Sequence, residues 1–307
     1  MCLTELICVI LQTDACEIVC VLIQITLNGI SYGATLALIG LAYSITFMGS
    51  RFFTFTFGTS YVTAAYVVLA LRTVFPLWLC FFVGVLVAAA IAAALEEVCY
   101  GPLRKRNDNS MVLMLASIGI FTVAENLISL HFGDDTKSFR DGLSPTLSLG
   151  AVRLTLTQAI IIASSAALIC ATYVFLRWNS YGTALRALSS NPQLAQIAGL
   201  DIRRITFVAV ALGGALAGLT SCLQALDTDM VPTMGFWALT YGIIASVVAG
   251  PRRPALAAIS GFAIGLVSNL AIAWIPGQWQ DTVAFAILAV VLFVRARPGQ
   301  DILANVA

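Results

Sequence analysis

The chain has 307 residues, of which 60% are apolar and 10% are charged, whereas roughly 25% of the residues in an average soluble domain are charged. This composition predicts an all-α protein that crosses a membrane several times, and the formal net charge of +1 excludes nucleic-acid binding through bulk electrostatics. The eight cysteines lie mostly in apolar runs and form no Cys-x-x-Cys pair. We therefore expect small buried cysteines and no metal site.

Nine apolar segments have a length that suits a membrane crossing, which takes about 20 residues of helix. They are 17–48, 52–71, 76–99, 111–131, 155–177, 204–226, 233–249, 254–273 and 279–295. Several are short or contain glycine, so we expect about eight or nine crossings, some of them by short or broken helices. Residues 1–307 then form a single transmembrane domain.

Small and polar residues interrupt the first segment at Asn28, Gly29, Ser31, Tyr32 and Gly33. A helix that loosens there exposes backbone groups, which a membrane tolerates only beside protein or a water-filled cavity. Close packing of an intact helix through its small residues is the alternative explanation.

Glu125 and Asn126 stand near the middle of the fourth segment. A charged carboxylate at that depth costs about 2.5–3.5 kcal/mol on insertion scales, so a partner, a proton or a wet cavity should accompany it. Glu125 either contacts a transported solute or holds neighbouring helices together, and the sequence leaves both roles open.

Residues 178–203 form the longest polar interruption of the chain. Within it, 181–198 has helical periodicity and places Leu185, Leu188, Leu194 and Ile197 on one side. Pro192 kinks or restarts this helix. Gly199 stands where a helix ends, and the following Asp201 is suited to cap the next one. We interpret this loop as a cytoplasmic coupling element that a partner protein grips.

The distribution of basic residues gives the orientation. If loop 178–203 is cytoplasmic, twelve of the sixteen lysines and arginines lie inside, as the positive-inside rule requires. The C-terminus is then cytoplasmic, and residues 132–153 form the main external loop. The four basic residues left outside are Arg72, Lys137, Arg140 and Arg153.

Segments 52–71 and 233–249 both place aromatic residues and threonines around a glycine. In this topology they run in opposite directions, and their neighbours follow suit. The pattern predicts an inverted repeat with a transport pathway at the interface between the two halves. Chance similarity of two apolar segments is the alternative.

Catalytic patterns are missing from the sequence. It contains no Gly-x-x-x-x-Gly-Lys loop for a nucleotide, and its single histidine cannot supply a Ser/His/Asp arrangement or a histidine-rich metal site. We expect a protein that is not an enzyme, with no catalytic residue, no metal and no cofactor of its own. Energy for active transport must come from ions or from ATP bound by partner subunits.

Three stretches together resemble the branched-chain amino acid ABC transporter permeases. They are NGISYGATLALIGLAYSITF, EEVCYGPLRKR with the following LASIGIFTVAENLISLHFG, and YGTALRALSSNPQLAQIAGLDIRRITFVAVALGGALAGL. The resemblance implies an inner-membrane permease subunit that pairs with a related permease or a second copy, sits on two ATPase subunits and receives solute from an external binding protein. It also implies that the coupling loop docks into the ATPase through Gly182, Arg186, Asn191, Pro192, Ala195, Gly199 and Asp201.

The chain departs from this family at positions near the expected pathway. Family members typically have Asn-Phe-Ala-His-Gly where this chain has Thr54-Phe55-Thr56-Phe57-Gly58, and a Gln-Asn pair where it has Glu125-Asn126. The expected solute is therefore a branched-chain or other amino acid, urea or a short amide.

We predict an ABC importer permease that works by alternating access. The residues expected to line its pathway are Asn28, Tyr32, Thr54, Thr56, Thr63, Glu125, Asn126, Thr233 and Tyr241. A stand-alone channel or ion-coupled carrier that uses Glu125 is the alternative, and a membrane scaffold that has lost transport is a third hypothesis.

Overall fold

The computed structural model describes residues 14–106, 109–139, 146–149, 152–250, 252–274 and 276–295. Within them, six helices are long and apolar enough to cross a membrane, by length and composition, and three shorter apolar helices accompany them. All nine segments expected from the sequence are therefore helical. A two-stranded hairpin is the departure from an all-α fold in this part of the chain.

The long apolar helices are α2 (Asp14–Ser50), α4 (Leu77–Leu95), α6 (Ser110–Phe132), α7 (Leu156–Trp178), α10 (Ile202–Asp227) and α12 (Pro254–Ala271). The short apolar helices are α3 (Thr56–Leu71), α11 (Met234–Ala249) and α13 (Gln280–Arg295). The remaining elements are the π-helical η1 (Glu96–Tyr100), α5 (Gly101–Arg106), β1 (Thr146–Leu149), β2 (Val152–Thr155), α8 (Ser180–Ser190), α9 (Pro192–Ile197) and the 3₁₀ turn η2 (Gly277–Trp279).

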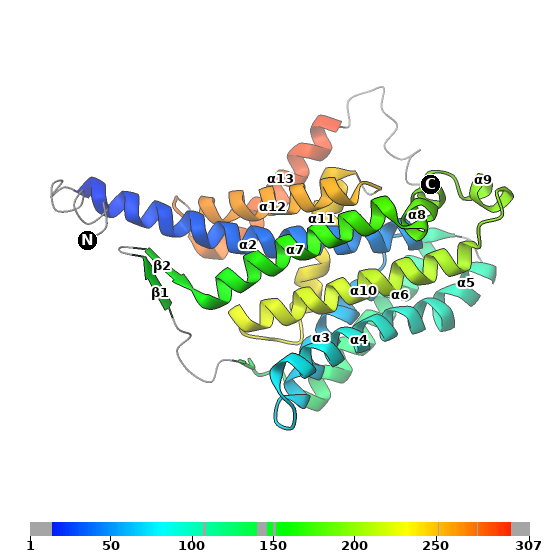
Figure 1. Ribbon diagram of the computed structural model, residues 1–307, viewed down its shortest axis with the longest axis horizontal. Coiled ribbons are helices and arrows are strands. Elements are labelled where there is room, and N and C mark those ends of the chain that lie inside the picture. The colour runs from blue at the N-terminus through cyan, green and yellow to red at the C-terminus, as the bar shows by residue number, and fades with distance from the viewer. Residues whose placement is uncertain are drawn as a thin grey trace.

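Figure 1 shows the long helices running along the long axis of the molecule. α5, α8 and α9 gather at one end, on the right in this view, and the start of α2 lies at the other end with the hairpin. We call these the α8–α9 end and the hairpin end.

The hairpin occupies the second half of the loop expected at 132–153, and the sequence interpretation missed it. β1 and β2 pair antiparallel, with Thr146 opposite Thr155 and Leu149 opposite Val152. The Thr155 N–H donates to Oε1 of Gln158 at 3.4 Å, so the second strand leads directly into the first turn of α7. Residues 140–145, 150 and 151 of this loop lie outside the described residues.

α2 is the central helix, and most of its second half is buried. Of the two explanations for the small residues near Gly33, a loosened helix is wrong, because α2 is continuous from Asp14 to Ser50. The small residues instead allow close packing on α12. A Cβ added to Gly33 would lie 2.9 Å from the Phe262 carbonyl oxygen, and one added to Gly40 would lie 2.6 Å from that of Ala257.

Helix packing in the bundle is symmetric between two groups of three helices. The packing of α2 on α12 corresponds to that of α10 on α4. In the same way, α3 packs on α4 and α11 packs on α12, while α2 contacts α11 and α10 contacts α3. α2 also packs on α10, and α3 on α11. Exchanging α2 with α10, α3 with α11 and α4 with α12 therefore reproduces the same set of neighbours.

The short helices α3 and α11 cross at Gly58 and Gly235, both in the first turn of their helix. A Cβ added to Gly58 would lie 2.9 Å from the Gly235 carbonyl oxygen, and one added to Gly235 would lie 2.6 Å from the Gly58 carbonyl oxygen. The contact is reciprocal, so each glycine makes room for the backbone of the other. A side chain at either position would force the two helices apart.

Gly235→Ala should therefore lower the free energy of unfolding by about 1–3 kcal/mol, because the new methyl group meets backbone that cannot move alone. Thermal denaturation of the purified protein in detergent measures this. Gly119→Ala in α6 is the matched control, since a Cβ there has no neighbour within 4 Å and alanine is the better helix former. Equal loss of stability in both variants would contradict the tight crossing.

Candidate functional site

The α8–α9 element is built by a series of helix caps. The Asn179 side chain accepts from the Tyr181 N–H at 3.0 Å and begins α8. The Asn191 side chain accepts from the Leu194 N–H at 3.1 Å, and Pro192 occupies the first turn of α9. The chain therefore restarts a helix at Pro192 instead of continuing the first one, as expected from proline chemistry.

Two further residues of the predicted coupling set end the element. Gly199 has φ +83, a left-handed conformation that glycine adopts without strain. Asp201 caps α10, accepting from the Arg204 N–H at 3.3 Å. Gly182 has a different role, since it lets α8 lie against the backbone of Leu176 at the end of α7.

The apolar residues of the element face two directions, which corrects the single face expected from periodicity. Leu185 and Leu188 are buried, at 5% and 1% exposure, whereas Leu194 and Ile197 are 62% and 82% exposed. At about 3.6 residues per turn, Leu194 and Ile197 lie on the opposite side of a helix from Leu185 and Leu188, so the four side chains could not share one face. The exposed apolar side chains make this surface suitable for a protein partner.

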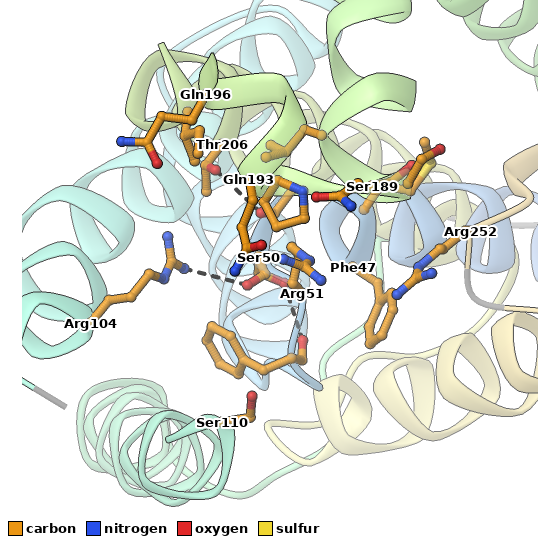
Figure 2. A pocket seen from close by; sticks show the side chains of 18 of the residues that line it. Phe47, Ser50, Arg51, Arg104, Ser110, Ser189, Gln193, Gln196, Thr206 and Arg252 are labelled. Carbon is orange, nitrogen blue, oxygen red and sulfur yellow. Dashed lines mark hydrogen bonds between the residues drawn. The ribbon is translucent and has the colours of Figure 1, made fainter. Parts of the chain in front are cut away.

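A cavity of about 730 Å³ lies on the inner side of this element (Figure 2). We call it the α8–α9 cleft. Its walls come from the end of α2 and the turn after it, from α5, α8 and α9, from the starts of α6 and α10, and from the turn before α12. The lining residues labelled in Figure 2 are Phe47, Ser50, Arg51, Arg104, Ser110, Ser189, Gln193, Gln196, Thr206 and Arg252.

Hydrogen bonds across the cleft fix its walls to one another. Thr206 Oγ1 of α10 donates to the Gly49 carbonyl oxygen at the end of α2, at 3.2 Å. Arg104 donates to the Ser50 carbonyl oxygen at 3.4 Å and forms an ion pair with Glu96 at 3.1 Å. These bonds connect α2, α5 and α10 at the place where α8 and α9 meet the bundle.

Thr54 and Thr56 of the predicted pathway lie in a buried hydroxyl chain. Thr54 Oγ1 donates to Thr56 Oγ1 at 2.9 Å, and Thr56 Oγ1 donates to the hydroxyl of Tyr100 at 2.7 Å. All three residues are at most 2% exposed. These hydrogen bonds hold the start of α3 against η1. In this conformation the three hydroxyl groups bond to one another.

Tyr32, from the middle of α2, and Tyr241, from the middle of α11, come together in an aromatic group. Their rings lie 6.4 Å apart, and Trp237 contacts both, with ring centroids 6.1 Å from Tyr32 and 4.9 Å from Tyr241. The Tyr241 hydroxyl donates to the Asp281 carboxylate at 2.7 Å. Sequence reading missed Trp237 and Asp281, although a Trp four residues before a chosen Tyr was a usable signal.

Asn28, about one turn before Tyr32 in α2, lies in a group of amide side chains. Its side-chain oxygen accepts from Gln24 at 3.3 Å and from Gln158 of α7 at 3.2 Å. Gln158 was also missed, because nothing in the sequence indicates that α7 reaches the first helix. Thr233, the last residue before α11, is exposed.

Thr63, Glu125 and Asn126 lie on the α3–α6 side of the bundle. Thr59 and Thr63 line an open, mostly apolar groove of about 560 Å³ with Gly119, Val123 and Leu127 of α6. Glu125 is half-buried, and exposed Asn126 donates to the Thr122 carbonyl oxygen at 2.7 Å. α6 packs mainly on α3, so this polar pair stands on a peripheral helix.

The described residues contain no group of three or more His, Cys, Asp or Glu side chains that could hold a metal ion. Cys80, Cys99, Cys170 and Cys222 are free thiols, and of these Cys80 and Cys222 are buried.

Comparison with known proteins gives consistent matches. Residues 25–292 match the family described as "Branched-chain amino acid transport system / permease component". The high-affinity branched-chain amino acid transport system permease protein LivH of Escherichia coli (strain K12) is 26% identical over 293 residues, 89% of this chain and 93% of that protein. BraD of Pseudomonas aeruginosa, a permease protein of the same description, is 24% identical over 89% and 94%.

The probable branched-chain amino acid transport permease protein LivH of Methanocaldococcus jannaschii is 27% identical over 79% of each chain. No solved structure matches the chain. The family match extends from within α2 to within α13, and so the chain belongs to the branched-chain amino acid transport permease family, whose ABC transport subunits are multi-pass membrane proteins without an ATPase domain of their own.

Proposed function

We propose that the chain is the permease subunit of an ABC importer, which moves a branched-chain or related amino acid inward by alternating access. The observation that carries this proposal is the α8–α9 surface, where Tyr181, Leu194 and Ile197 are 50%, 62% and 82% exposed. These side chains stand beyond the ends of the apolar helices. Such a surface suits a protein partner, and in an ABC importer that partner would be an ATPase subunit.

The charge distribution supports a cytoplasmic location for the α8–α9 end. α5, the end of α7, α8 and the start of α10 all carry basic residues, as do the turns after α2 and before α12; the residues are Arg51, Arg104, Lys105, Arg106, Arg177, Arg186, Arg203, Arg204, Arg252 and Arg253. Basic loops favour the cytoplasmic side. On this assignment α13 runs toward the cytoplasm and the C-terminus is inside.

The symmetric packing supports an inverted repeat of α2–α4 and α10–α12. Figure 1 shows α2 and α10 running in opposite directions along the bundle. The short helices α3 and α11 meet at equivalent glycines, Gly58 and Gly235. Short helices at corresponding positions of two inverted halves are a feature of transport pathways.

Glu125 and Asn126 support a second permease subunit on the α3–α6 side. A carboxylate at membrane depth is costly beside lipid, whereas in this chain α6 is a peripheral helix. A partner permease that covers the groove of Thr59 and Thr63 would shield this pair. The substrate would be delivered by an external binding protein.

The matched family and the similarity to LivH and BraD, which are branched-chain amino acid transport permeases, support an amino-acid substrate. The aromatic group of Tyr32, Trp237 and Tyr241, with the carboxylate of Asp281, suits a solute that carries both an apolar side chain and an ammonium group. Urea lacks both.

The decisive experiment reconstitutes the chain with its permease partner, ATPase subunits and binding protein in proteoliposomes. Leucine, isoleucine or valine should stimulate ATP hydrolysis and enter the vesicles only when ATP is present, and urea should do neither. Solute flux through vesicles that contain this chain alone, without ATP, would contradict the proposal and favour a carrier that uses Glu125.

Ile197→Glu should reduce substrate-stimulated ATP hydrolysis by at least about tenfold, since it places a charge in an apolar docking surface. Because Ile197 is 82% exposed in the single chain, the variant should keep the thermal stability of the unmodified protein. Lys105→Glu, on exposed α5 at the same end, is the control for a simple change of surface charge. Normal stimulation in the Ile197 variant would exclude docking at α9.

Asp201→Ala should lower the free energy of unfolding by about 1 kcal/mol, because α10 loses the side chain that caps it. Asp201→Asn keeps a capping oxygen and should retain most of that stability, since the exposed ion pair with Arg204 contributes little. Thermal denaturation of both variants separates the cap from the charge. If the two variants lose equal stability, the charge of Asp201 matters and the cap does not.

A further inference from the structure

Four polar side chains from four helices, Asp281, Tyr241, Tyr32 and Tyr61, lie close together in the bundle. We propose that Asp281, with the aromatic group of Tyr32, Trp237 and Tyr241, binds the ammonium group of the transported solute, and that a single chain forms this site. The identity of the solute as an amino acid rests on the proposed function. The position of the site and the group that is recognised there come from the geometry of this chain.

Hydroxyl groups from both three-helix groups converge on Asp281. The Tyr241 hydroxyl donates to its carboxylate at 2.7 Å, and the Tyr32 hydroxyl lies within electrostatic range of both. Tyr32 belongs to α2, Tyr241 to α11 and Asp281 to the first turn of α13. Because α2 and α11 come from different groups of three helices, the site lies between the two groups. Transporters built from inverted repeats bind their substrates at such an interface.

Aromatic rings stand beside the carboxylate. The centroid of the Trp237 ring lies 4.9 Å from that of Tyr241 and 6.1 Å from that of Tyr32. Tyr32 and Trp237 are half-buried, so part of each ring is accessible, whereas Tyr241 is buried. An ammonium group is attracted to the face of an aromatic ring and forms strong hydrogen bonds with a carboxylate. The combination therefore favours an organic cation over an anion or a neutral amide.

Asp281 is accessible to a solute. The residue is exposed, and among the described residues no lysine, arginine or histidine forms an ion pair with it. On the proposed orientation α13 runs toward the cytoplasm, so its first turn lies toward the external side of the membrane. A solute released by an external binding protein would therefore meet the Asp281 carboxylate before it reaches the buried tyrosines.

A buried hydroxyl group on α3 is a second, independent indication of a ligand. Tyr61 is 1% exposed, and its hydroxyl has no hydrogen-bond partner among the described residues. This hydroxyl lies within electrostatic range of the Tyr32 hydroxyl and of the Cys222 thiol. Buried hydroxyl groups in proteins normally have a partner. A polar group of a solute that moves inward past Tyr32 would supply one.

The test measures ligand binding to the purified chain in detergent by saturation-transfer NMR, without ATPase subunits or a binding protein. Leucine and leucinamide both carry the ammonium group, and both should bind the unmodified chain. The oxo acid of leucine has the same carbon skeleton but a keto group in place of the ammonium group. It should bind at least about tenfold more weakly, because it cannot form the charged hydrogen bond with Asp281.

Asp281→Asn removes the charge but keeps an oxygen that can accept from the Tyr241 hydroxyl. This variant should bind leucine and leucinamide at least about tenfold more weakly and should lose the preference for leucine over its oxo acid. Asp281→Glu restores the charge and should recover most of the affinity. Asp229→Asn is the matched control, since Asp229 is another exposed carboxylate, located just after α10, and it should bind all three ligands as the unmodified chain does.

Three results would overturn the proposal: equal binding of leucinamide by the unmodified chain and Asp281→Asn, binding of the oxo acid as tight as that of leucine, or no binding of leucinamide to the unmodified chain. Thermal unfolding of each variant checks that it is folded. Because the assay contains no ATPase subunit, its failure would leave ATP-driven import of leucine by the assembled complex intact. Loss of that import beside normal binding would instead contradict the proposed function alone.

Discussion

Direct contact of backbone with backbone at glycine is the constraint on which this bundle depends. α2 reaches the centre because Gly33 and Gly40 place it against the carbonyl oxygens of α12. A helix in a membrane gains no hydrophobic advantage from leaving lipid for another apolar helix, so close packing must supply the stability. The glycine contacts fix the position of α2, and α2 in turn fixes α10, α11 and α7 around it.

The α8–α9 element shows how one short polar segment can serve two purposes. Leu185 and Leu188 attach it to the bundle, while Leu194 and Ile197 remain on the outside. The spacing of the four residues separates these roles, because it places the two pairs on opposite sides of a helix of about 3.6 residues per turn, and α9 begins as a helix of its own at Pro192. A segment held on one side and open on the other is suited to transmit movement between a partner and the helices behind it.

Sequence reasoning was strongest where composition decides the structure and weakest where distant segments meet. Apolar length located each apolar helix of the described residues, and proline chemistry predicted a kink or a restart at Pro192, which is a restart. Hydroxyl content could not reveal that Thr56 would bond to Tyr100, because the two residues are brought together only by the packing of α3 on η1. For the same reason, Asp281 was found beside Tyr241 only once α13 had a place in the bundle.

The crossing of Gly58 and Gly235 has a consequence for the history of the chain. If the two halves arose by duplication, the two glycines descend from one ancestral residue that once met its own copy. Each now occupies the space that the other leaves empty, so a larger residue in one half is excluded by the backbone of the other. The surrounding segments, FFTFTFG and VPTMG, differ in sequence, whereas a side chain at either glycine would meet the backbone of the other half.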